Sequence, residues 1–567
     1  IVFSGQVSRK DVPLRIIERP SEYLLSYYGT DLLAIKEIRK ELVLALLQKE
    51  STNGIKRFLR RIISIENDLP CSTNDMIDKA ILGRWVRGGP SAVEFTQFFG
   101  FPDEFAGESL PRYELKPLEE VRAREDWRGL HPYQQVLYEE MQDWYISPGS
   151  NGSGILVLPT GTGKTRVAVK LIIEDFNRSY EKTGRIRHNV LWIAHTKELC
   201  EQAIDTISRM WTMEGRKGQL LNIYRFWEDI DIGNLVGATG VIVAGIQKLA
   251  RALAEDDSRI ILQNYLTRRL RLVVIDEAHL ADNPSYMGLL DFLSGTGNYE
   301  PNNIKEWKLL GLTATPFKSD ETRTKDLQKL FEEMFSLGTV NSDRLKDIDR
   351  LGVYRWMQEN RFLSHDVRYR PLYIPSQKPF GLTEREKDYL LQFQDFNDSA
   401  LKRMSLNIDR NDYIVNSVKQ EIENEDSRKI LLFACSVPHC HMLNWQFTES
   451  GIKSMYVTGE MSRQQRAINI NNFRSQSPDE PIVLINYGIL TTGFDDPMID
   501  TIFITRPTCS RVLYHQMVGR GLRGVKNGGN KNGKCLILDI KDNFESFHGF
   551  TGVVDFMEEG KNLGLAY

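Results

Sequence analysis

The sequence has few cysteines, no long apolar run and almost no net charge. Six cysteines occur in 567 residues and no two form a Cys-x-x-Cys pair, so neither a disulfide framework nor a zinc ribbon is expected. No apolar run approaches the roughly 18 residues that cross a bilayer, and no secretory signal precedes the first charged residues. We therefore expect no membrane partner. With 73 Lys+Arg against 76 Asp+Glu, the formal net charge is −3, which excludes an overall basic coat protein but allows a local basic groove.

One tight group of possible metal ligands stands at the end of an expected strand. It consists of Cys435, His439, Cys440 and His441. A second pair of ligands at zinc spacing is missing, so we favour packing over metal binding, with the metal site as the alternative.

The rest of the composition is that of an ordinary globular protein, with 41% hydrophobic and 26% charged residues. At roughly 150 residues per domain the length suggests about three to four domains. Residues 1–118 are expected to form a helical accessory or docking domain. Apolar residues at helical spacing predict helices over 31–50 and 91–99 there.

From residue 119 onward, short β-branched runs alternate with helical stretches, as in parallel sheets with crossover helices. This predicts two α/β units in series, over 119–322 and 323–567, the second including a linker and a helical insertion around 383–425. The expected strands are 155–158, 190–194, 241–244, 272–275 and 309–312 in the first unit, and 430–433, 482–485, 501–504 and 536–538 in the second.

The strongest local signal is a glycine-containing loop between an apolar strand and a helix. Backbone amides of such a loop, at a helix N-terminus, turn toward phosphate groups. A lysine there places a cation on the phosphates, and the next hydroxyl is suited to Mg²⁺. The general pattern has glycine where this chain has Leu158. The predicted phosphate-binding residues are Pro159, Thr160, Gly161, Thr162, Gly163, Lys164 and Thr165.

Two further motifs complete a hydrolytic site for a nucleotide. A buried strand ends in Asp276 and Glu277, followed by Ala278 and His279. Asp276 is suited to hold Mg²⁺ with Thr165, and Glu277 to polarise the attacking water. Far downstream, Arg520 and Arg523 are expected on one helix face, where their guanidinium groups would stabilise transition-state charge.

Taken in order, these motifs resemble those of superfamily 2 helicases of the DEAH type, and the resemblance covers roughly residues 119–545. It implies two RecA-like domains and the use of ATP and Mg²⁺. It assigns adenine recognition to Gln134, a catalytic role to Gln516, and coupling of the cleft to the opposite face to His279, Thr313 and Thr315. Gly493 and Asp495 would border the ATP. Strand-end positions further suggest nucleic-acid backbone contacts by Thr196, Lys197, Gln247 and Thr491.

Several motif sequences are especially similar to RadD-like bacterial DNA repair helicases, namely 490–495, 506–508 and 518–523. The cysteine-rich module that follows the RadD motor is absent from this sequence, and residues 1–118 match nothing in that family. The resemblance implies a cytoplasmic, bacterial location.

The sequence therefore predicts an ATP-dependent DNA helicase or translocase, in repair or in antiviral defence. One alternative is the motor of a restriction or defence complex that moves on duplex DNA and recruits a protein partner through residues 1–118. A second is an RNA helicase. A third is a nucleotide-gated clamp that holds nucleic acid without moving.

Overall fold

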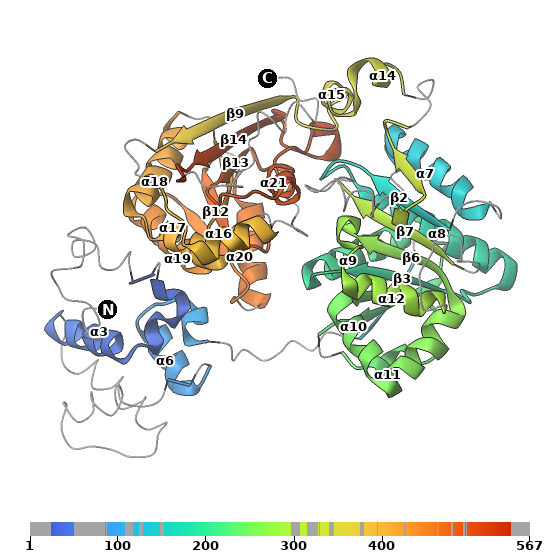
Figure 1. The fold of residues 1–567 in the computed structure, drawn as a ribbon, viewed down its shortest axis with the longest axis horizontal. Helices are drawn as coiled ribbons and strands as arrows, with labels where there is room; N and C mark the ends of the chain where they lie inside the picture. Colours follow the sequence, from blue (N-terminus) through green and yellow to red (C-terminus); the bar gives the residue numbers. More distant parts are fainter. Residues whose placement is uncertain are drawn as a thin grey trace.

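The computed structural model describes most of the two expected α/β units and part of the N-terminal region. The described residues are 24–25, 27–49, 85–86, 88–107, 117–123, 129–147, 152–228, 230–295, 307–314, 327, 329–339, 345–374, 379–393, 395–424, 427–461, 463–477, 480–490, 494 and 496–545. Two α/β lobes lie beside each other, and the N-terminal helices lie against the second of them (Figure 1).

The first lobe is built on an eight-stranded sheet in the order β1-β4-β5-β3-β6-β7-β2-β8. All neighbouring strands are parallel except β1 and β4, which are antiparallel. The strands are β1 (Leu118–Arg122), β2 (Ser153–Val157), β3 (Asn189–Ala194), β4 (Leu220–Phe226), β5 (Gly240–Gly245), β6 (Leu270–Asp276), β7 (Lys308–Thr313) and β8 (Glu333–Ser336).

Both faces of this sheet are buried, which explains its continuous apolar strands. In β3, Val190 and Trp192 belong to the core on one face, and Leu191 and Ile193 to the core on the other. The first core is covered by α7 (Pro132–Ile146), α8 (Lys164–Thr183) and α9 (Lys197–Glu214), and the second by α10 (Ile246–Ala254) and α12 (Pro284–Ser294).

The second lobe is built on a six-stranded, all-parallel sheet in the order β11-β12-β10-β13-β14-β9. Its strands are β9 (Asp366–Tyr373), β10 (Lys429–Phe433), β11 (Ser454–Val457), β12 (Ile482–Asn486), β13 (Thr501–Ile504) and β14 (Lys534–Lys541). Its helices are α16 (Glu384–Phe393), α17 (Asp398–Ser405), α18 (Ile408–Glu423), α19 (Val437–Glu449), α20 (Arg463–Ser475) and α21 (Arg511–Val518).

The predicted α/β class with two parallel sheets is confirmed, and every strand expected from the sequence is present. The stretch around 383–425 holds α16, α17 and α18, which we call the insertion helices. The first sheet extends beyond residue 322, because β8 pairs with β2 at its edge. The short helices α14 (Ile348–Leu351) and α15 (Val353–Glu359) follow β8 and lead to the second lobe.

The described part of the N-terminal region, residues 24–25, 27–49, 85–86 and 88–107, is here called the N-terminal module. It holds the 3-10 helices η2 (Gly29–Ala34) and η3 (Asp103–Ala106) and the helices α3 (Lys36–Lys49) and α6 (Pro90–Phe98). The single helix predicted over 31–50 is therefore wrong in its first turn. Ile35 is extended there, with φ −79° and ψ 117°, and separates η2 from α3.

The N-terminal module packs on the second lobe. A Cβ atom on Gly29 would lie 3.0 Å from Cγ of Pro438 at the start of α19. The Thr30 hydroxyl donates to Oε2 of Glu460 at 2.6 Å, and the Tyr456 hydroxyl donates to Glu104. β1, which follows in the chain, belongs to the first lobe. The chain therefore passes from the N-terminal module, which is docked on the second lobe, to a strand of the first lobe.

The Cys435–His441 group is part of the packed interior, as the sequence favoured. His439 accepts a hydrogen bond from the Cys435 amide at 3.0 Å, and its other ring nitrogen lies 3.1 Å from Oδ1 of Asn411. Among the residues that the structure describes, no group of three or more His, Cys, Asp or Glu could hold a metal ion. Within the same residues, no helix is both long and apolar enough to cross a membrane.

His441 lies in the interface between the N-terminal module and the second lobe. Its ring centroid is 5.3 Å from that of Phe105 and 4.6 Å from that of Tyr456. The ring is buried, and neither of its nitrogens has a hydrogen-bond partner among the described residues. Burial lowers the pKa of His441 to about 4, so the folded protein holds this imidazole neutral.

We predict that His441→Leu flattens the pH dependence of stability. In the unfolded chain the His441 imidazole takes up a proton near pH 6.5, whereas in the folded chain it does so only near pH 4. The free energy of unfolding therefore decreases as pH falls from 6.5 to 4. Between pH 7.5 and 5.5 this amounts to about 1 kcal/mol. Urea unfolding at both pH values measures it: the native chain should lose about 1 kcal/mol more than the variant. Equal losses would contradict the prediction.

Candidate nucleotide site and nucleic-acid face

The predicted phosphate-binding loop connects β2 to the first turn of α8. Gly161 and Gly163 have φ of 78° and 89°, backbone conformations that favour glycine. The Thr162 hydroxyl donates to the Pro159 carbonyl at 2.7 Å, which holds the loop closed on itself. α8 is 20 residues long, and its unsatisfied N-terminal amides lie at this loop. The local geometry is that of an anion cradle.

Two residues of α7 support the loop from behind. Gln134 donates through Nε2 to the Thr162 carbonyl at 2.9 Å and accepts from the His131 amide at 3.0 Å. The Tyr133 hydroxyl donates to the same Thr162 carbonyl at 2.7 Å. A Cβ atom on Gly163 would overlap the Gln134 amide group. Gln134 thus lies against the loop, and its assignment to adenine stays a prediction.

The acidic pair stands where β6 ends, facing the loop. Glu277 has φ 54° and ψ 54°, a left-handed conformation that is uncommon for a residue other than glycine. Its amide donates to Oδ1 of Asp276 at 3.0 Å, and its Oε2 lies 3.4 Å from Nδ1 of His279. Backbone strain of this kind concentrates at functional sites, where the surrounding fold maintains it.

The charges of the loop and the acidic pair act on one another. Burial lowers the pKa of Lys164, while Glu277 and Asp276 oppose that shift. Burial and the neighbouring Glu277 carboxylate raise the pKa of Asp276, and Lys164 opposes that shift. Asp276 is buried, and Glu277 and Lys164 are half-buried. Such a site is suited to a polyphosphate carrying a divalent cation, because the carboxylates can bind the cation and the ammonium can pair with the phosphates.

The second lobe brings its arginines to the same site. Arg520 acts electrostatically on both Lys164 and Asp276. A Cβ atom on Gly161 would lie 3.8 Å from Nε of Arg523, and one on Gly519 would overlap the Thr160 side chain. The segment that carries the arginines therefore touches the phosphate-binding loop of the first lobe.

The prediction that both arginines lie on one helix face is wrong. α21 ends at Val518, and Arg520 and Arg523 lie in the turn that follows. Glycines at 519 and 521 disfavour continuation of the helix, and Gly521 packs so closely on Cys535 and Ile502 that a Cβ atom there would lie 2.7 Å from each. Arg520 donates to the Phe494 carbonyl, and Arg523 forms an isolated β-bridge with Leu363. Gln516 lies on α21, half-buried.

Of the predicted coupling residues, two lie beside the site. Thr313 ends β7, is fully buried, and its carbonyl accepts from the Leu158 amide at 3.2 Å. His279 contacts Glu277 as described. The predicted site residues Thr315, Thr491, Gly493 and Asp495 lie outside the described residues.

The expected nucleic-acid residues lie together at the carboxyl ends of β3 and β5, which are neighbours. Thr196 caps α9 by accepting from the Leu199 amide at 3.3 Å. Lys197 forms an ion pair with Glu228 at 2.6 Å, and Gln247 donates to the His195 carbonyl at 3.1 Å. All three are at least partly accessible. They stay predicted backbone contacts.

The residues present fit ATP and Mg²⁺. The loop would meet the phosphates with backbone amides and Lys164, and a Cβ atom at Gly163 has no room. Thr165 and Asp276 supply the hydroxyl and carboxylate oxygens that Mg²⁺ prefers. The assignment of Lys164, Thr165, Asp276, Glu277 and the arginines stays a prediction.

Sequence reasoning missed the residues that hold these parts in place. The ring of Phe362, just before the second lobe, lies 4.7 Å from that of Tyr133 and links the two lobes. Asp395 and Arg410 hold the segment leading to α21, as argued below. No motif marks them, since each acts through a contact distant in sequence. Among these supporting residues, only Tyr133 could have been suspected from the sequence, because it directly precedes Gln134.

Two family descriptions match the chain. "Type III restriction enzyme, res subunit" matches residues 128–318, within the first lobe, and "Helicase conserved C-terminal domain" matches residues 413–525, within the second. The matched residues include the phosphate-binding loop and the acidic pair in one case and the arginines in the other. The specific likeness to RadD is not borne out by these matches.

Curated proteins are similar over most of the chain. It is 28% identical over 396 residues to the "Putative ATP-dependent helicase IRC3" of Saccharomyces cerevisiae, covering 70% of this chain and 49% of that protein. It is 23% identical over 432 residues to the "Type I restriction enzyme EcoKI endonuclease subunit" of Escherichia coli, covering 70% of this chain and 34% of that protein. The chain thus spans half or less of both relatives. A solved structure, "S. cerevisiae Dbp5 bound to RNA and ADP BeF3", aligns at TM-score 0.46 and 14% identity over 77% of this chain and 93% of that one.

We expect Lys164→Ala to abolish ATP hydrolysis. The variant removes the cation that the loop places against the phosphates, an interaction worth several kcal/mol in such sites. Phosphate release measured at saturating ATP should fall at least a hundredfold. Turnover near that of the native chain would show that the loop is not the nucleotide site.

Glu277→Gln should separate binding from hydrolysis. The amide preserves size and hydrogen bonding but cannot accept a proton from the attacking water. Affinity for a fluorescent ATP analogue should stay within about threefold while phosphate release falls at least a hundredfold. Loss of nucleotide affinity would instead indicate that Glu277 supports the fold of the site.

Proposed function

Because the chain has the two-part core of a superfamily 2 helicase ATPase, we propose that it couples ATP hydrolysis to movement along DNA. The observation that carries this proposal is the meeting of two lobes at one site. Lys164 and the acidic pair come from the first lobe, while Arg520 comes from the second and acts on both of them. Chemistry at such a site requires the lobes to be together, so the nucleotide controls their separation.

In this mechanism the loop amides and Lys164 would bind and orient the phosphates, and Thr165 and Asp276 would hold Mg²⁺. The chemistry that Mg²⁺ would supply there is neutralisation of phosphate charge. Glu277 positions the attacking water and accepts its proton, while His279 at 3.4 Å fixes the direction of the Glu277 carboxylate. Arg520 and Arg523 stabilise the charge that develops on the transferred group.

Movement follows from the placement of the nucleic-acid face. Thr196, Lys197 and Gln247 would contact the phosphodiester backbone at one edge of the first sheet. Thr313 ends β7, and its carbonyl accepts from the Leu158 amide beside the phosphate-binding loop; it is our candidate for coupling this face to the nucleotide site. Alternating closure and opening of the lobes would then move the nucleic-acid contacts of one lobe relative to those of the other.

A second candidate is translocation on duplex DNA without strand separation, within a restriction or defence complex. Two observations favour it: the match to a restriction-enzyme family over residues 128–318 and the similarity to the EcoKI subunit. The N-terminal module would then receive the partner subunit, since it is docked on the second lobe through Glu104 and Thr30.

The first measurement is steady-state ATP hydrolysis without nucleic acid and with single-stranded DNA, duplex DNA or single-stranded RNA, each at 50 and 200 mM salt. We expect stimulation by DNA that weakens strongly at the higher salt, because phosphate contacts release counterions. Stimulation by RNA alone would overturn the choice of DNA. The Lys164→Ala variant is the control for contaminating ATPases.

The DNA-stimulated motor is then tested on two substrates. Release of a labelled strand from a partial duplex indicates unwinding, whereas release of a third strand from a triplex without unwinding indicates translocation on duplex DNA. DNA-dependent hydrolysis with neither product would contradict both forms of the motor and support a clamp.

A further inference from the structure

The segment 505–510 connects β13 to α21 and determines where the arginine turn begins. It is short, and it leads through the eight residues of α21 to Arg520. Any change in its path would therefore move Gln516 and both arginines together. The polar contacts of this segment come from the insertion helices, from β10 and from residues after β14.

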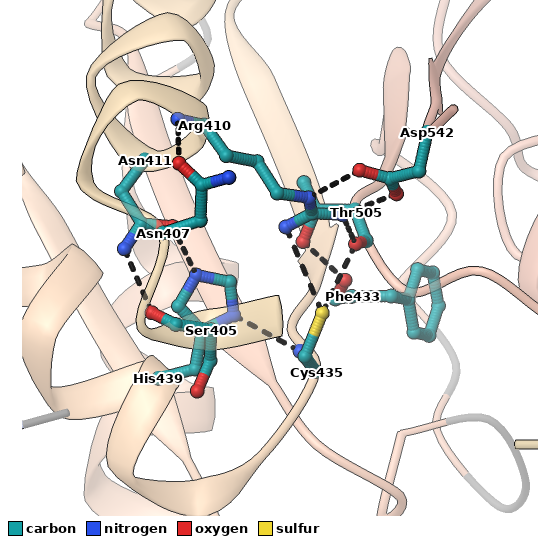
Figure 2. A network of polar contacts seen from close by, with 9 residues as sticks. All are labelled: Ser405, Asn407, Arg410, Asn411, Phe433, Cys435, His439, Thr505 and Asp542. Carbon is teal, nitrogen blue, oxygen red and sulfur yellow. Dashed lines mark hydrogen bonds and ion pairs between the residues drawn. The ribbon is translucent and has the colours of Figure 1, made fainter. Parts of the chain in front are cut away.

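Thr505 is held by a buried network around Arg410 of α18 (Figure 2). Arg410, 1% exposed, donates through Nε and Nη2 to the two carboxylate oxygens of Asp542 at 2.7 and 2.9 Å. Its Nη2 also donates to the Thr505 carbonyl. The Asp542 carboxylate outweighs the effect of burial and raises the pKa of Arg410, so this guanidinium stays charged inside the lobe.

Two further contacts fix the same residue to β10. The Cys435 thiol donates to the Thr505 carbonyl at 3.2 Å. The Thr505 amide and hydroxyl both donate to the Phe433 carbonyl, at 3.2 and 2.7 Å (Figure 2). Every polar group of Thr505 therefore has a buried partner, which fixes the start of the segment to β10 and to Arg410.

The next residues are held by Asp395, which lies between α16 and α17. Its Oδ1 accepts from the Thr508 hydroxyl at 2.9 Å and from the Cys509 amide at 3.2 Å, and its Oδ2 accepts from Arg506 at 3.1 Å. The Thr508 hydroxyl accepts in turn from the Ser510 amide at 3.0 Å. Ser510 is the N-cap of α21, accepting from the Leu513 amide at 3.3 Å. A continuous series of hydrogen bonds thus runs from the insertion helices to the first turn of α21.

We propose that Asp395 and Arg410 are positioning residues for ATP hydrolysis, which hold the 505–510 segment so that α21 presents Arg520 and Arg523 to the phosphate-binding loop. This inference rests on the proposed function. Neither residue contacts the loop, and each acts through the backbone that it binds. Since a displacement of about 1 Å at a catalytic group costs on the order of a hundredfold in rate, a looser segment lowers turnover without removing a phosphate contact.

Asp395→Ala is the informative variant, because Asp395 is partly exposed and its loss leaves no unpaired charge deep in the lobe. Arg410 is unsuitable as the first test, since its removal would leave Asp542 buried and unpaired. Glu386→Ala is the matched control. Glu386 also lies in the insertion helices and also accepts several bonds, from Thr383, Ser399 and Arg403, but none from 505–510.

The experiment measures kcat and KM for ATP, binding of a fluorescent ATP analogue, and hydrogen exchange of peptides from 505–523. For Asp395→Ala we expect kcat to fall at least tenfold, analogue affinity to stay within about twofold, and exchange to rise over 511–523. Asp395→Asn, which keeps the acceptor oxygen, should recover most of the loss. Glu386→Ala should leave both kcat and the exchange of 511–523 unchanged.

An Asp395→Ala chain with native kcat would overturn the inference, as would an equal fall in kcat for Glu386→Ala. If Asp395→Ala does not fold, Thr508→Val serves instead, because it removes the hydroxyl that links Asp395 to the Ser510 amide. This variant should lower kcat while leaving the affinity for the analogue unchanged. Failure of the proposed function is distinguishable, since it would appear as absence of hydrolysis in the native chain itself.

Discussion

The proposed activity depends most on the approach of Arg520 of the second lobe to Lys164 and Asp276 of the first, close enough for its charge to act on both. A guanidinium placed near an ammonium is unfavourable unless negative charge lies between them. Asp276 and Glu277 supply part of that charge, and phosphate groups would supply the rest. Under the proposed function, the affinity of the two lobes for each other would therefore depend on what occupies the site. The two sheets place these few charges, since Lys164 follows β2, Asp276 ends β6 and Arg520 lies between β13 and β14.

Much of the fold could be predicted because its signals are local. Most strands of both sheets are short apolar runs buried on both faces. In a run such as Leu272–Ile275, all the apolar residues that predict the strand are buried in the structure. The phosphate-binding loop could also be predicted, since Gly161 and Gly163 adopt positive-φ conformations that favour glycine. What could not be read were β1, β4, β8, β9 and β11, which lie at or near sheet edges and are less uniformly apolar.

The site divides in the same way. Residues that contact ligand occur in recognisable motifs, whereas those that hold the motifs in place do so through tertiary contacts. Arg410 and Asp542 are 132 positions apart, and Asp395 and Thr508 are 113 apart. The i and i+3 spacing of Arg520 and Arg523 suggested a helix, but α21 ends at Val518, just before the glycines at 519 and 521. The close packing of Gly521 on Cys535 is a tertiary contact that such spacing cannot reveal.

The N-terminal module changes the topology of the two-lobed core. The chain passes between the lobes a first time from Gly107, in the module docked on the second lobe, to β1 in the first, and a second time through α14 and α15. Ten Cα steps separate Gly107 from Pro117, a reach of at most ~35 Å. While the module stays docked, the two lobes and the two crossings form a closed ring. This ring limits how far the two lobes can separate at two places along the chain, where a core without the module would be limited at one.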